Sequence, residues 1–258
     1  MESDDEQSRS LQEKILHSER ERRYLRKDSD DRKVMEEVFD QATLLALKEL
    51  ISQREILQLN GVVRAGKEAR VYQGVGSDGR PRAVKIYLMV SSDFRKRLVY
   101  IAGDKRFQRI PSNSHEIIKL WVRKEFRNLQ QADSAGIRVP KPYSFFRNVL
   151  IMEYIGEPPL PAPLLAEAEV DERDYAWVFK TISKLYKKAG LVHADLSEFN
   201  IFKWGEERII FDFGSAVLSS HPEAGEFLRR DITNMVRFFK KRGIVKKEAE
   251  AWLREITK

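Results

Sequence analysis

The most specific chemical signal in the sequence is a run of eight residues that pairs a carboxylate with an amide. The run, HADLSEFN, spans residues 193–200 and contains Asp195 and, five positions later, Asn200. Asp212, the first residue of an Asp-Phe-Gly sequence, follows twelve residues after Asn200. Phosphoryl transfer uses such a set, because one carboxylate orients the attacking hydroxyl while an Asn and a second Asp hold divalent ions on the phosphates. The spacing therefore predicts phosphoryl transfer, with His193 holding the loop by hydrogen bonds and taking no catalytic part.

A lysine and a glutamate farther upstream complete this predicted site. Lys85 lies in the β-rich sequence Ala-Val-Lys-Ile, from which its side chain could reach the α and β phosphates of a nucleotide. Glu125 falls on the apolar face of a predicted helix, four residues after Trp121 and four before Leu129. A carboxylate that faces the core must be paired, because its desolvation is otherwise costly. We therefore expect an ion pair between Lys85 and Glu125.

The loop expected to cover the phosphates departs from the glycine-rich pattern of ordinary kinases. When Gly-x-Gly-x-x-Gly-x-Val is aligned on Val71, its glycine positions are taken by Arg64, Gly66 and Ala69. With one glycine left, the loop should be stiffer and more cationic. We expect Lys67 and backbone N–H groups near Gly66 to contact the phosphates.

Hydrophobic periodicity predicts the elements that position these residues. Residues 34–57 have apolar side chains at helical spacing, which predicts an amphipathic helix packed on the domain that follows. The apolar residues of its predicted stripe are Met35, Val38, Phe39, Ala42, Leu45 and Ala46. Short β-rich runs between turn residues predict a strand meander over 59–88. A helix from an N-cap at Ser114 to Ala135 and a strand pair at 143–147 and 149–154 should follow.

The second half of the chain is predicted to be mainly helical. A proline-rich linker at 157–163 should separate two lobes. Residues 171–189 form the next predicted helix, with Asp171 near its N-cap. Two short strands, around 200–203 and 208–213, then precede two basic amphipathic helices.

These elements predict an α+β fold with three segments. They are a charged tail and amphipathic helix over 1–58, a β-rich N-lobe over 59–156 and a helical C-lobe over 157–258. Only 46 residues follow Asp212, and they contain no Ala-Pro-Glu sequence. We therefore expect neither a long activation segment nor the several helices on which ordinary protein kinases dock peptides.

Composition and charge narrow the class of protein further. The 258 residues include no Cys, which excludes disulfides, a thiolate nucleophile and a Cys-based zinc site. No apolar run approaches the roughly 18 residues that span a bilayer, so we expect a cytoplasmic protein without a membrane partner. The formal charge of +7 combines −4 in residues 1–40 with +11 in the remainder. This distribution suits a phosphate-bearing partner, a nucleotide or a nucleic acid, but also fits a solvated basic face.

Four segments together resemble the RIO family of atypical protein kinases. They are GKEARVY at 66–72, HADLSEFN at 193–200, FDFGSA at 211–216 and LRRDI at 228–232. Residues 100–107 and 124–129 further resemble its RIO-one branch, and the likeness extends over about residues 45–258. It implies a trimmed two-lobed protein-kinase-like fold with an extra N-terminal helical segment. It also implies ATP and Mg²⁺ or Mn²⁺ as cofactors, serine/threonine phosphorylation including autophosphorylation, ATP hydrolysis, and a role in maturing the small ribosomal subunit, with its RNA as a partner.

The resemblance also implies roles for individual residues. Asp195 would be the catalytic base, Asn200 and Asp212 the metal ligands, and Lys85 the phosphate anchor. Asp212 would in addition accept a phosphoryl group transiently. The nucleotide-binding set would be Gly66, Lys67, Glu68, Ala69, Lys85, Glu125, Met152, Glu153 and Ile155, with the backbone at 153 and 155 on adenine and Met152 behind the ring. Three serines, Ser91, Ser92 and Ser112, match a loop that is a candidate for phosphorylation.

Two other functions remain compatible with the sequence. A small-molecule kinase of the aminoglycoside or choline type also uses His-x-Asp, a following Asn and a later Asp, although such enzymes devote more residues to a helical acceptor lobe. A ribosome- or RNA-binding module switched by nucleotide would use the basic segments 85–127 and 228–258, which carry charges of +7 and +6. The acceptor of labelled phosphate distinguishes the first alternative, and the ATP dependence of binding distinguishes the second.

Overall fold

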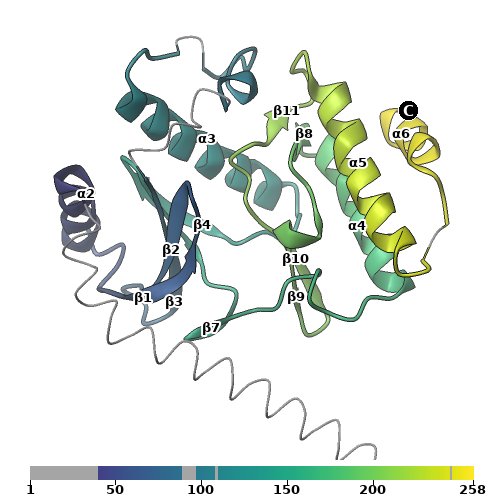
Figure 1. The fold of residues 1–258 in the computed structure, drawn as a ribbon. Helices are drawn as coiled ribbons and strands as arrows, with labels where there is room; N and C mark the ends of the chain where they lie inside the picture. The colour runs from purple at the N-terminus through teal and green to yellow at the C-terminus, as the bar shows by residue number, and fades with distance from the viewer. Residues whose placement is uncertain (1–39, 89–96, 108–109, 245) are drawn as a thin grey trace, which may run out of the picture.

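The computed structural model describes residues 40–88, 97–107, 110–244 and 246–258 and has a β-rich part and a helical part (Figure 1). The β-rich part is built on a five-stranded antiparallel sheet of order β1-β2-β3-β5-β4. Its strands are β1 (Gln58–Ala65), β2 (Ala69–Val75), β3 (Pro81–Tyr87), β4 (Pro142–Phe146) and β5 (Val149–Glu153). The predicted meander and the predicted strand pair are therefore confirmed, and they join into one sheet through the pairing of β3 with β5.

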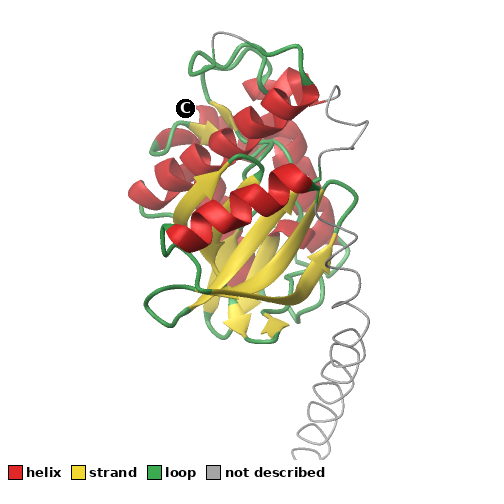
Figure 2. Ribbon diagram, turned by 90° about the vertical axis from the view of Figure 1, so that its left-hand side faces the viewer, coloured by secondary structure: helices red, strands yellow, loops and turns green. Residues whose placement is uncertain are grey.

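The sheet lies between two helices because successive strand residues face opposite sides. In β3, Val84 and Ile86 pack with α2 (Gln41–Ser52), whereas Ala83 and Tyr87 belong to the core that contains α3 (Ser114–Ser134). The alternation follows the two-residue period of a strand. Figure 2, which looks from the left-hand side of Figure 1, shows α2 lying across the near face of the sheet. Lys85 shares the α3 side of β3, so the fold aims this lysine at α3.

The N-terminal helix packs on the domain as predicted, but its buried face coincides only in part with the predicted stripe. Its buried residues are Thr43, Ala46, Leu47 and Leu50. Leu45, which the predicted stripe included, is 51% exposed, and the described helix ends at Ser52 instead of Leu57. Ala46 of the predicted stripe is buried, but the prediction for Leu45 was wrong, because α2 meets the sheet through Thr43, Leu47 and Leu50 on the other side of Ala46. Met35, Val38 and Phe39 lie outside the described residues.

The cap of α3 is also displaced by one residue from its prediction. Asn113, not Ser114, is the N-cap, and its side chain accepts a hydrogen bond from the His115 N–H. Either residue type can cap a helix, so the sequence did not discriminate between them. The predicted helical stop is confirmed, because Gly136 follows α3 with φ of +72°.

The helical part is built on α4 (Glu172–Lys187), α5 (Ala224–Lys240) and α6 (Ala249–Thr257) (Figure 1). Three short strand pairs accompany these helices. Asp171 caps α4 in a capping box with Asp174, which confirms the predicted start of this helix. The short strands are β6 (Gly156–Glu157), β7 (Leu160–Pro161), β8 (Leu191–Val192), β9 (Ile201–Trp204), β10 (Glu207–Ile210) and β11 (Val217–Leu218). They pair as β6–β7, β8–β11 and β9–β10.

One hydrophobic core runs through both parts and joins them. It includes Tyr87 and Leu150 from the sheet, Trp121 from α3, and Phe179 and Phe239 from the helical part. Within the described residues, no helix has the length and apolar composition needed to cross a membrane. The residue boundaries predicted for the tail and the two lobes stay predictions.

We expect Leu50→Ala to destabilise the protein by about 2–5 kcal/mol, because Leu50 is fully buried between α2 and the sheet. Leu45→Ala, on the exposed side of the same helix, should change the free energy of unfolding by less than about 0.5 kcal/mol. Urea denaturation of the two variants measures the difference. Equal effects would show that α2 does not pack on the sheet through Leu50.

Candidate active site

Two adjoining cavities lie where the sheet meets the helical part. The first, of about 360 Å³, is the more polar of the two and is lined by several charged side chains, and the second, of about 290 Å³, is lined mainly by apolar side chains. Arg64, Val71, Met152 and Phe211 line both. The first cavity collects most of the predicted site residues: Gly66, Lys67, Glu68, Ala69, Lys85, Met152, Asp195, Asn200 and Asp212. The second contains Met152, Glu153 and Ile155. The two cavities therefore provide a polar compartment beside an apolar one.

Lys85 is bound by two carboxylates at the back of the polar cavity. Its Nζ lies 2.7 Å from Glu125 Oε1 and 2.8 Å from Asp212 Oδ1. The ion pair with Glu125 predicted from the sequence is thus present, and Tyr87 donates its hydroxyl to the other oxygen of Glu125. Burial lowers the pKa of Lys85, but the carboxylates of Asp212 and Glu125 outweigh it and hold that pKa well above its usual value. The lysine is therefore charged, as a phosphate ligand must be.

Asp212 is held in a backbone conformation that few residues adopt. Its φ is +67°, in the left-handed region, where residues other than glycine usually incur backbone strain. The side chain is 46% exposed toward the cavity, which leaves it open to a ligand. Burial raises the pKa of Asp212, but the Lys85 ammonium overcomes this effect and lowers the pKa below its ordinary value. The carboxylate is therefore ionised and available.

Two buried side chains of α3 bind the backbone that follows Asp212. Lys124 donates to the carbonyl oxygens of Gly214, at 2.8 Å, and Ala216. Asn128 donates through Nδ2 to the carbonyl oxygens of Phe213, at 3.0 Å, and Ala216, at 2.7 Å. Burial lowers the pKa of Lys124 to about 7. These bonds connect α3 directly to the loop that presents Asp212.

Gly214 is required by the close approach of an indole ring. A Cβ on this residue would lie 2.7 Å from Nε1 of Trp121 on α3. That distance is inside van der Waals contact, so a larger residue would push the loop away from α3. The glycine of the Asp-Phe-Gly sequence therefore serves the packing of the loop.

The loop that contains Asp195 is fixed by hydrogen bonds from both sides. Asp231, buried on α5, accepts the N–H of Ala194 at 2.8 Å and the N–H of Leu196 at 2.9 Å. Asn200 donates through Nδ2 to the Asp195 carbonyl at 2.7 Å. Burial and the neighbouring Asp212 carboxylate raise the pKa of Asp195. A raised pKa suits a general base, which must hold a proton during the reaction.

His193 supports this loop from its buried side, as the sequence predicted. Its Nε2 lies 3.0 Å from the Phe211 carbonyl oxygen, and its Nδ1 is buried without a hydrogen-bond partner in the described structure. Burial lowers the pKa of His193 to about 4. The ring is therefore neutral, with Nε2–H donating to Phe211.

The phosphate-facing loop is closed by its own backbone. The Gly66 N–H donates to the Ala69 carbonyl at 3.0 Å, so this N–H is already engaged. Lys67 and Glu68 line the polar cavity, and Glu68 pairs with Arg97. The Gly66 N–H is therefore not free for a phosphate, whereas the Lys67 side chain lines the cavity. Contacts of the loop with phosphates stay a prediction.

Glu153 and Ile155 line the apolar cavity on the segment that joins the two parts. The Glu153 carboxylate lies 2.6 Å from the Arg138 guanidinium. The backbone N–H of Glu153 donates to the Lys141 carbonyl at 2.8 Å. The Ile155 carbonyl accepts the Ala162 N–H at 2.8 Å. These bonds fix the segment against the apolar cavity, and the backbone contacts to adenine stay a prediction.

Asn200 and Asp212 are the residues that could supply oxygen ligands to a divalent cation. Both residues line the polar cavity, and the bond from Asn200 Nδ2 to Asp195 leaves its Oδ1 as the atom able to bind a cation. Among the described residues, no group of three or more His, Cys, Asp or Glu is placed to hold a metal. Two oxygen ligands suit Mg²⁺, which usually keeps several waters and completes its shell with substrate phosphates.

Sequence reasoning missed four residues that shape this site. Lys124, Asn128 and Asp231 act on backbone groups, and Arg97 lines the polar cavity. The first three belong to the segments 124–129 and 228–232, which the family resemblance had singled out without giving them a role. Ser91 and Ser92 lie outside the described residues, and Ser112 lies two residues before α3.

The family model described as a RIO domain matches residues 70–252 of this chain. The chain is 42% identical over 242 residues to the RIO-type serine/threonine-protein kinase Rio1 of Haloferax volcanii, covering 93% of this chain and 83% of that protein. It is 38% identical over 239 residues to Rio1 of Methanocaldococcus jannaschii, covering 92% and 79%. It is 37% identical over 227 residues to human serine/threonine-protein kinase RIO1, covering 86% of this chain and 40% of the human protein.

A solved structure has the same fold at lower sequence identity. The Rio2 kinase of Chaetomium thermophilum, described as an ADP/Mg²⁺-phosphoaspartate complex, superposes with a TM-score of 0.64 and 22% identity. The match covers 81% of this chain and 65% of the Chaetomium chain. The expected α+β, two-lobed protein-kinase-like fold is confirmed.

Acidification should destabilise the protein through His193. The pKa of His193 is about 4 in the folded protein and near 6.5 in an unfolded chain. The unfolded state therefore binds the proton more tightly, and about 3 kcal/mol of stability should be lost as the pH falls from 6.5 to 4. Urea denaturation across this range should show a smaller loss in His193→Gln. His115→Gln, at an exposed histidine, should keep the full pH dependence, and equal slopes in all three proteins would contradict the assignment.

Asp231→Asn should loosen the loop around Asp195. The two carboxylate oxygens of Asp231 each accept one backbone N–H, and an amide would present an N–H₂ group to one of them. We expect a loss of about 1–3 kcal/mol in the free energy of unfolding and faster hydrogen exchange at the Ala194 and Leu196 amides. Asp133→Asn, at an exposed acid of α3, is the control. Unchanged exchange at both amides would sink this role for Asp231.

Proposed function

The chain belongs to the RIO family of atypical kinases, and from this premise we propose that it transfers the γ-phosphoryl group of ATP to serine or threonine hydroxyls of proteins, itself included. The observation that carries the proposal is the meeting of Lys85, Asp195, Asn200 and Asp212 in one polar cavity of about 360 Å³. The apolar cavity of about 290 Å³ beside it offers a place for the adenine ring. Phosphoryl transfer depends on positioning and charge stabilisation, which this arrangement provides.

Asp195 acts as the base that orients the acceptor hydroxyl. Burial and the Asp212 charge raise its pKa, which improves its ability to take the hydroxyl proton as the new P–O bond forms. Lys85 binds the phosphates with its ammonium, while Glu125 keeps that ammonium in place. Asn200 and Asp212 would hold Mg²⁺ or Mn²⁺, which neutralises charge on the phosphates when bound.

The nucleotide base is held by the segment that joins the two lobes. Met152 lines both cavities and would lie behind the adenine ring. Backbone groups at Glu153 and Ile155 would pair with the edge of the ring, because both residues line the apolar cavity. Lys67, from the loop between β1 and β2, lines the same cavity and would contact the phosphates.

Asp212 is also suited to accept the phosphoryl group itself. In this step a carboxylate oxygen of Asp212 bonds to the γ-phosphorus, the bond from that phosphorus to the β,γ-bridging oxygen breaks, and ADP leaves. Water then cleaves the aspartyl phosphate, which restores the carboxylate and releases phosphate, so the net reaction is ATP hydrolysis. The 46% exposure of the Asp212 side chain toward the cavity supports this route, and the Chaetomium relative is described as a phosphoaspartate complex.

The acceptor is a protein in this proposal. The Rio1 relatives from Haloferax, Methanocaldococcus and human are described as serine/threonine-protein kinases, which favours a protein over a soluble alcohol as the acceptor. A role in maturation of the small ribosomal subunit, with its RNA as a partner, follows from the family resemblance and fits the charge of +11 beyond residue 40. A cytoplasmic location stays a prediction.

Asp195→Ala should abolish phosphoryl transfer and spare ATP binding, because this carboxylate orients the hydroxyl and has no ground-state contact with the phosphates. Incubation with γ-labelled ATP, Mg²⁺ and a protein substrate should show transfer lowered by about 10²–10⁴-fold, with the ATP dissociation constant changed less than about twofold. Asp212→Asn should weaken metal-dependent ATP binding and transfer together. Asp133→Ala, at an exposed acid, is the control.

Three outcomes would contradict the proposal. A loss of ATP affinity in Asp195→Ala would remove the base assignment, and label found solely on a soluble alcohol would exclude a protein kinase. Label on Asp212 that is released by hydroxylamine would support the aspartyl phosphate, whereas label stable to hydroxylamine on serine alone would exclude that intermediate.

A further inference from the structure

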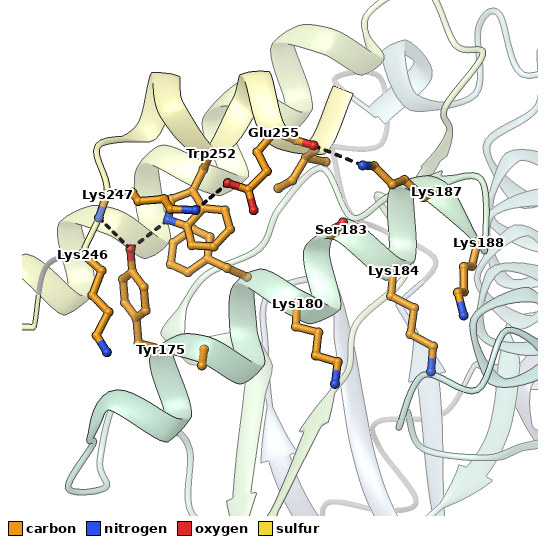
Figure 3. A pocket seen from close by; sticks show the side chains of 13 residues that line it. Tyr175, Lys180, Ser183, Lys184, Lys187, Lys188, Lys246, Lys247, Trp252 and Glu255 are labelled. Atoms are coloured by element: carbon orange, nitrogen blue, oxygen red, sulfur yellow. Dashed lines mark hydrogen bonds and ion pairs between the residues drawn. The ribbon is translucent and has the colours of Figure 1, made fainter. Parts of the chain in front are cut away.

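An open groove of about 700 Å³ lies between α4 and α6, apart from the nucleotide cavities (Figure 3). It shares no lining residue with either cavity of the candidate active site. Its floor is apolar and aromatic, and its rim is rich in lysine. Nothing in the proposed phosphoryl transfer uses this groove.

The floor of the groove is a fixed aromatic cluster. Trp252 on α6 stacks on Phe179 of α4, with ring centroids 4.5 Å apart and planes within 7°. Its indole Nε1 donates to the Tyr175 hydroxyl at 2.8 Å, and that hydroxyl also accepts the Lys247 backbone N–H. Figure 3 shows these bonds converging on Tyr175. The cluster ties α6 to α4: Phe179 and Tyr175 are buried within it, and Trp252 is the ring that stays partly exposed at the floor of the groove.

The rim carries six lysines against a single acid, Glu255. The lysines are Lys180, Lys184, Lys187, Lys188, Lys246 and Lys247. Lys180, Lys184 and Lys187 on α4 and Lys188 at its C-cap recur at helical spacing, so they follow one side of that helix. Lys246 pairs with Glu172 and Lys247 with Glu255, but in the described part of the chain Lys180 and Lys188 have no ion-pair partner. The groove therefore has an uncompensated positive potential.

We propose that this groove binds an acidic protein segment that inserts apolar side chains between α4 and α6. Carboxylates of the segment would meet the lysine rim, and one or two large apolar side chains would cover the floor, which is the arrangement of a protein interface with an apolar centre and a polar edge. The proposal rests on the proposed function, because such a segment would bring a substrate protein to the kinase from a surface outside the active site.

The floor argues against single-stranded nucleic acid as the occupant. Binding of unpaired bases depends on aromatic faces that are open to stacking. One face of Trp252 is covered by Phe179, and Lys247 Nζ lies 4.3 Å from the centre of the ring. The groove thus offers apolar surface but no open aromatic face.

Charge reversal at the two unpaired lysines tests the proposal. The probe is a fluorescein-labelled helical peptide of about four turns, with Leu every three or four positions among Glu residues. Binding is measured by fluorescence anisotropy without ATP. Lys180→Glu combined with Lys188→Glu should weaken binding by about tenfold or more, because two attractive charges become repulsive. The matched control combines Lys48→Glu and Lys105→Glu, two exposed lysines outside the groove, and should change binding less than about twofold.

A change in the peptide tests the apolar floor without disturbing α6. Replacing the Leu residues of the probe by Ser should weaken binding to the unsubstituted protein by about tenfold. Equal binding of both peptides, or no effect of the charge reversals, would overturn the proposal. A single-stranded oligouridine is the competitor. If it binds more tightly than the peptide, displaces it and loses binding in the same variants, the groove is a nucleic-acid site and the proposal is overturned.

The result is separable from the test of phosphoryl transfer. Asp195→Ala should bind the acidic peptide as the unsubstituted protein does, because the groove and the polar cavity share no residue. Peptide binding by a protein that fails to transfer phosphate would refute the kinase proposal alone. Phosphoryl transfer by a protein that fails to bind the peptide would refute the groove proposal alone.

Discussion

The buried ammonium of Lys85 is the interaction on which the site depends. It binds Glu125 of α3 at 2.7 Å and Asp212 of the helical part at 2.8 Å, so one cation joins three segments that are distant in the sequence. A charge removed from water costs several kcal/mol unless partners compensate it, so the sheet, α3 and the Asp212 loop must come together to satisfy Lys85. The same requirement places a cation and an open carboxylate side by side.

Backbone hydrogen bonds, more than charge, set the position of the two aspartates. Lys124 and Asn128 hold the carbonyl groups after Asp212, and Asp231 holds the N–H groups on both sides of Asp195. These buried donors and acceptors have little freedom, because leaving one unsatisfied costs about 1–3 kcal/mol. The strained φ of Asp212 is maintained by this surrounding network. The site is thus preorganised before any substrate binds, which phosphoryl transfer favours.

Basic side chains gather at two sites that differ in burial and in screening by salt. In the nucleotide cavities, Lys85 is buried and already balanced by carboxylates, so its charge acts at short range on phosphates. In the groove between α4 and α6, the lysines are at the surface and screened by salt, so they favour an extended acidic partner over a single anion. The net charge of the chain alone does not distinguish a buried phosphate-binding lysine from a lysine-rich surface groove.

The sequence by itself determined the secondary-structure elements, such as the strands within 59–88 and the helix capped by Asp171. It also determined that Glu125 faces inward and therefore requires a cationic partner. Local periodicity encodes such features because each depends on residues a few positions apart. Only the tertiary structure decided that Leu45 is exposed and that Lys124, Asn128 and Asp231 serve the site. Their partners are backbone groups 35 to 92 residues away, and a backbone carbonyl or N–H, identical at almost every position, leaves no side-chain pattern to read.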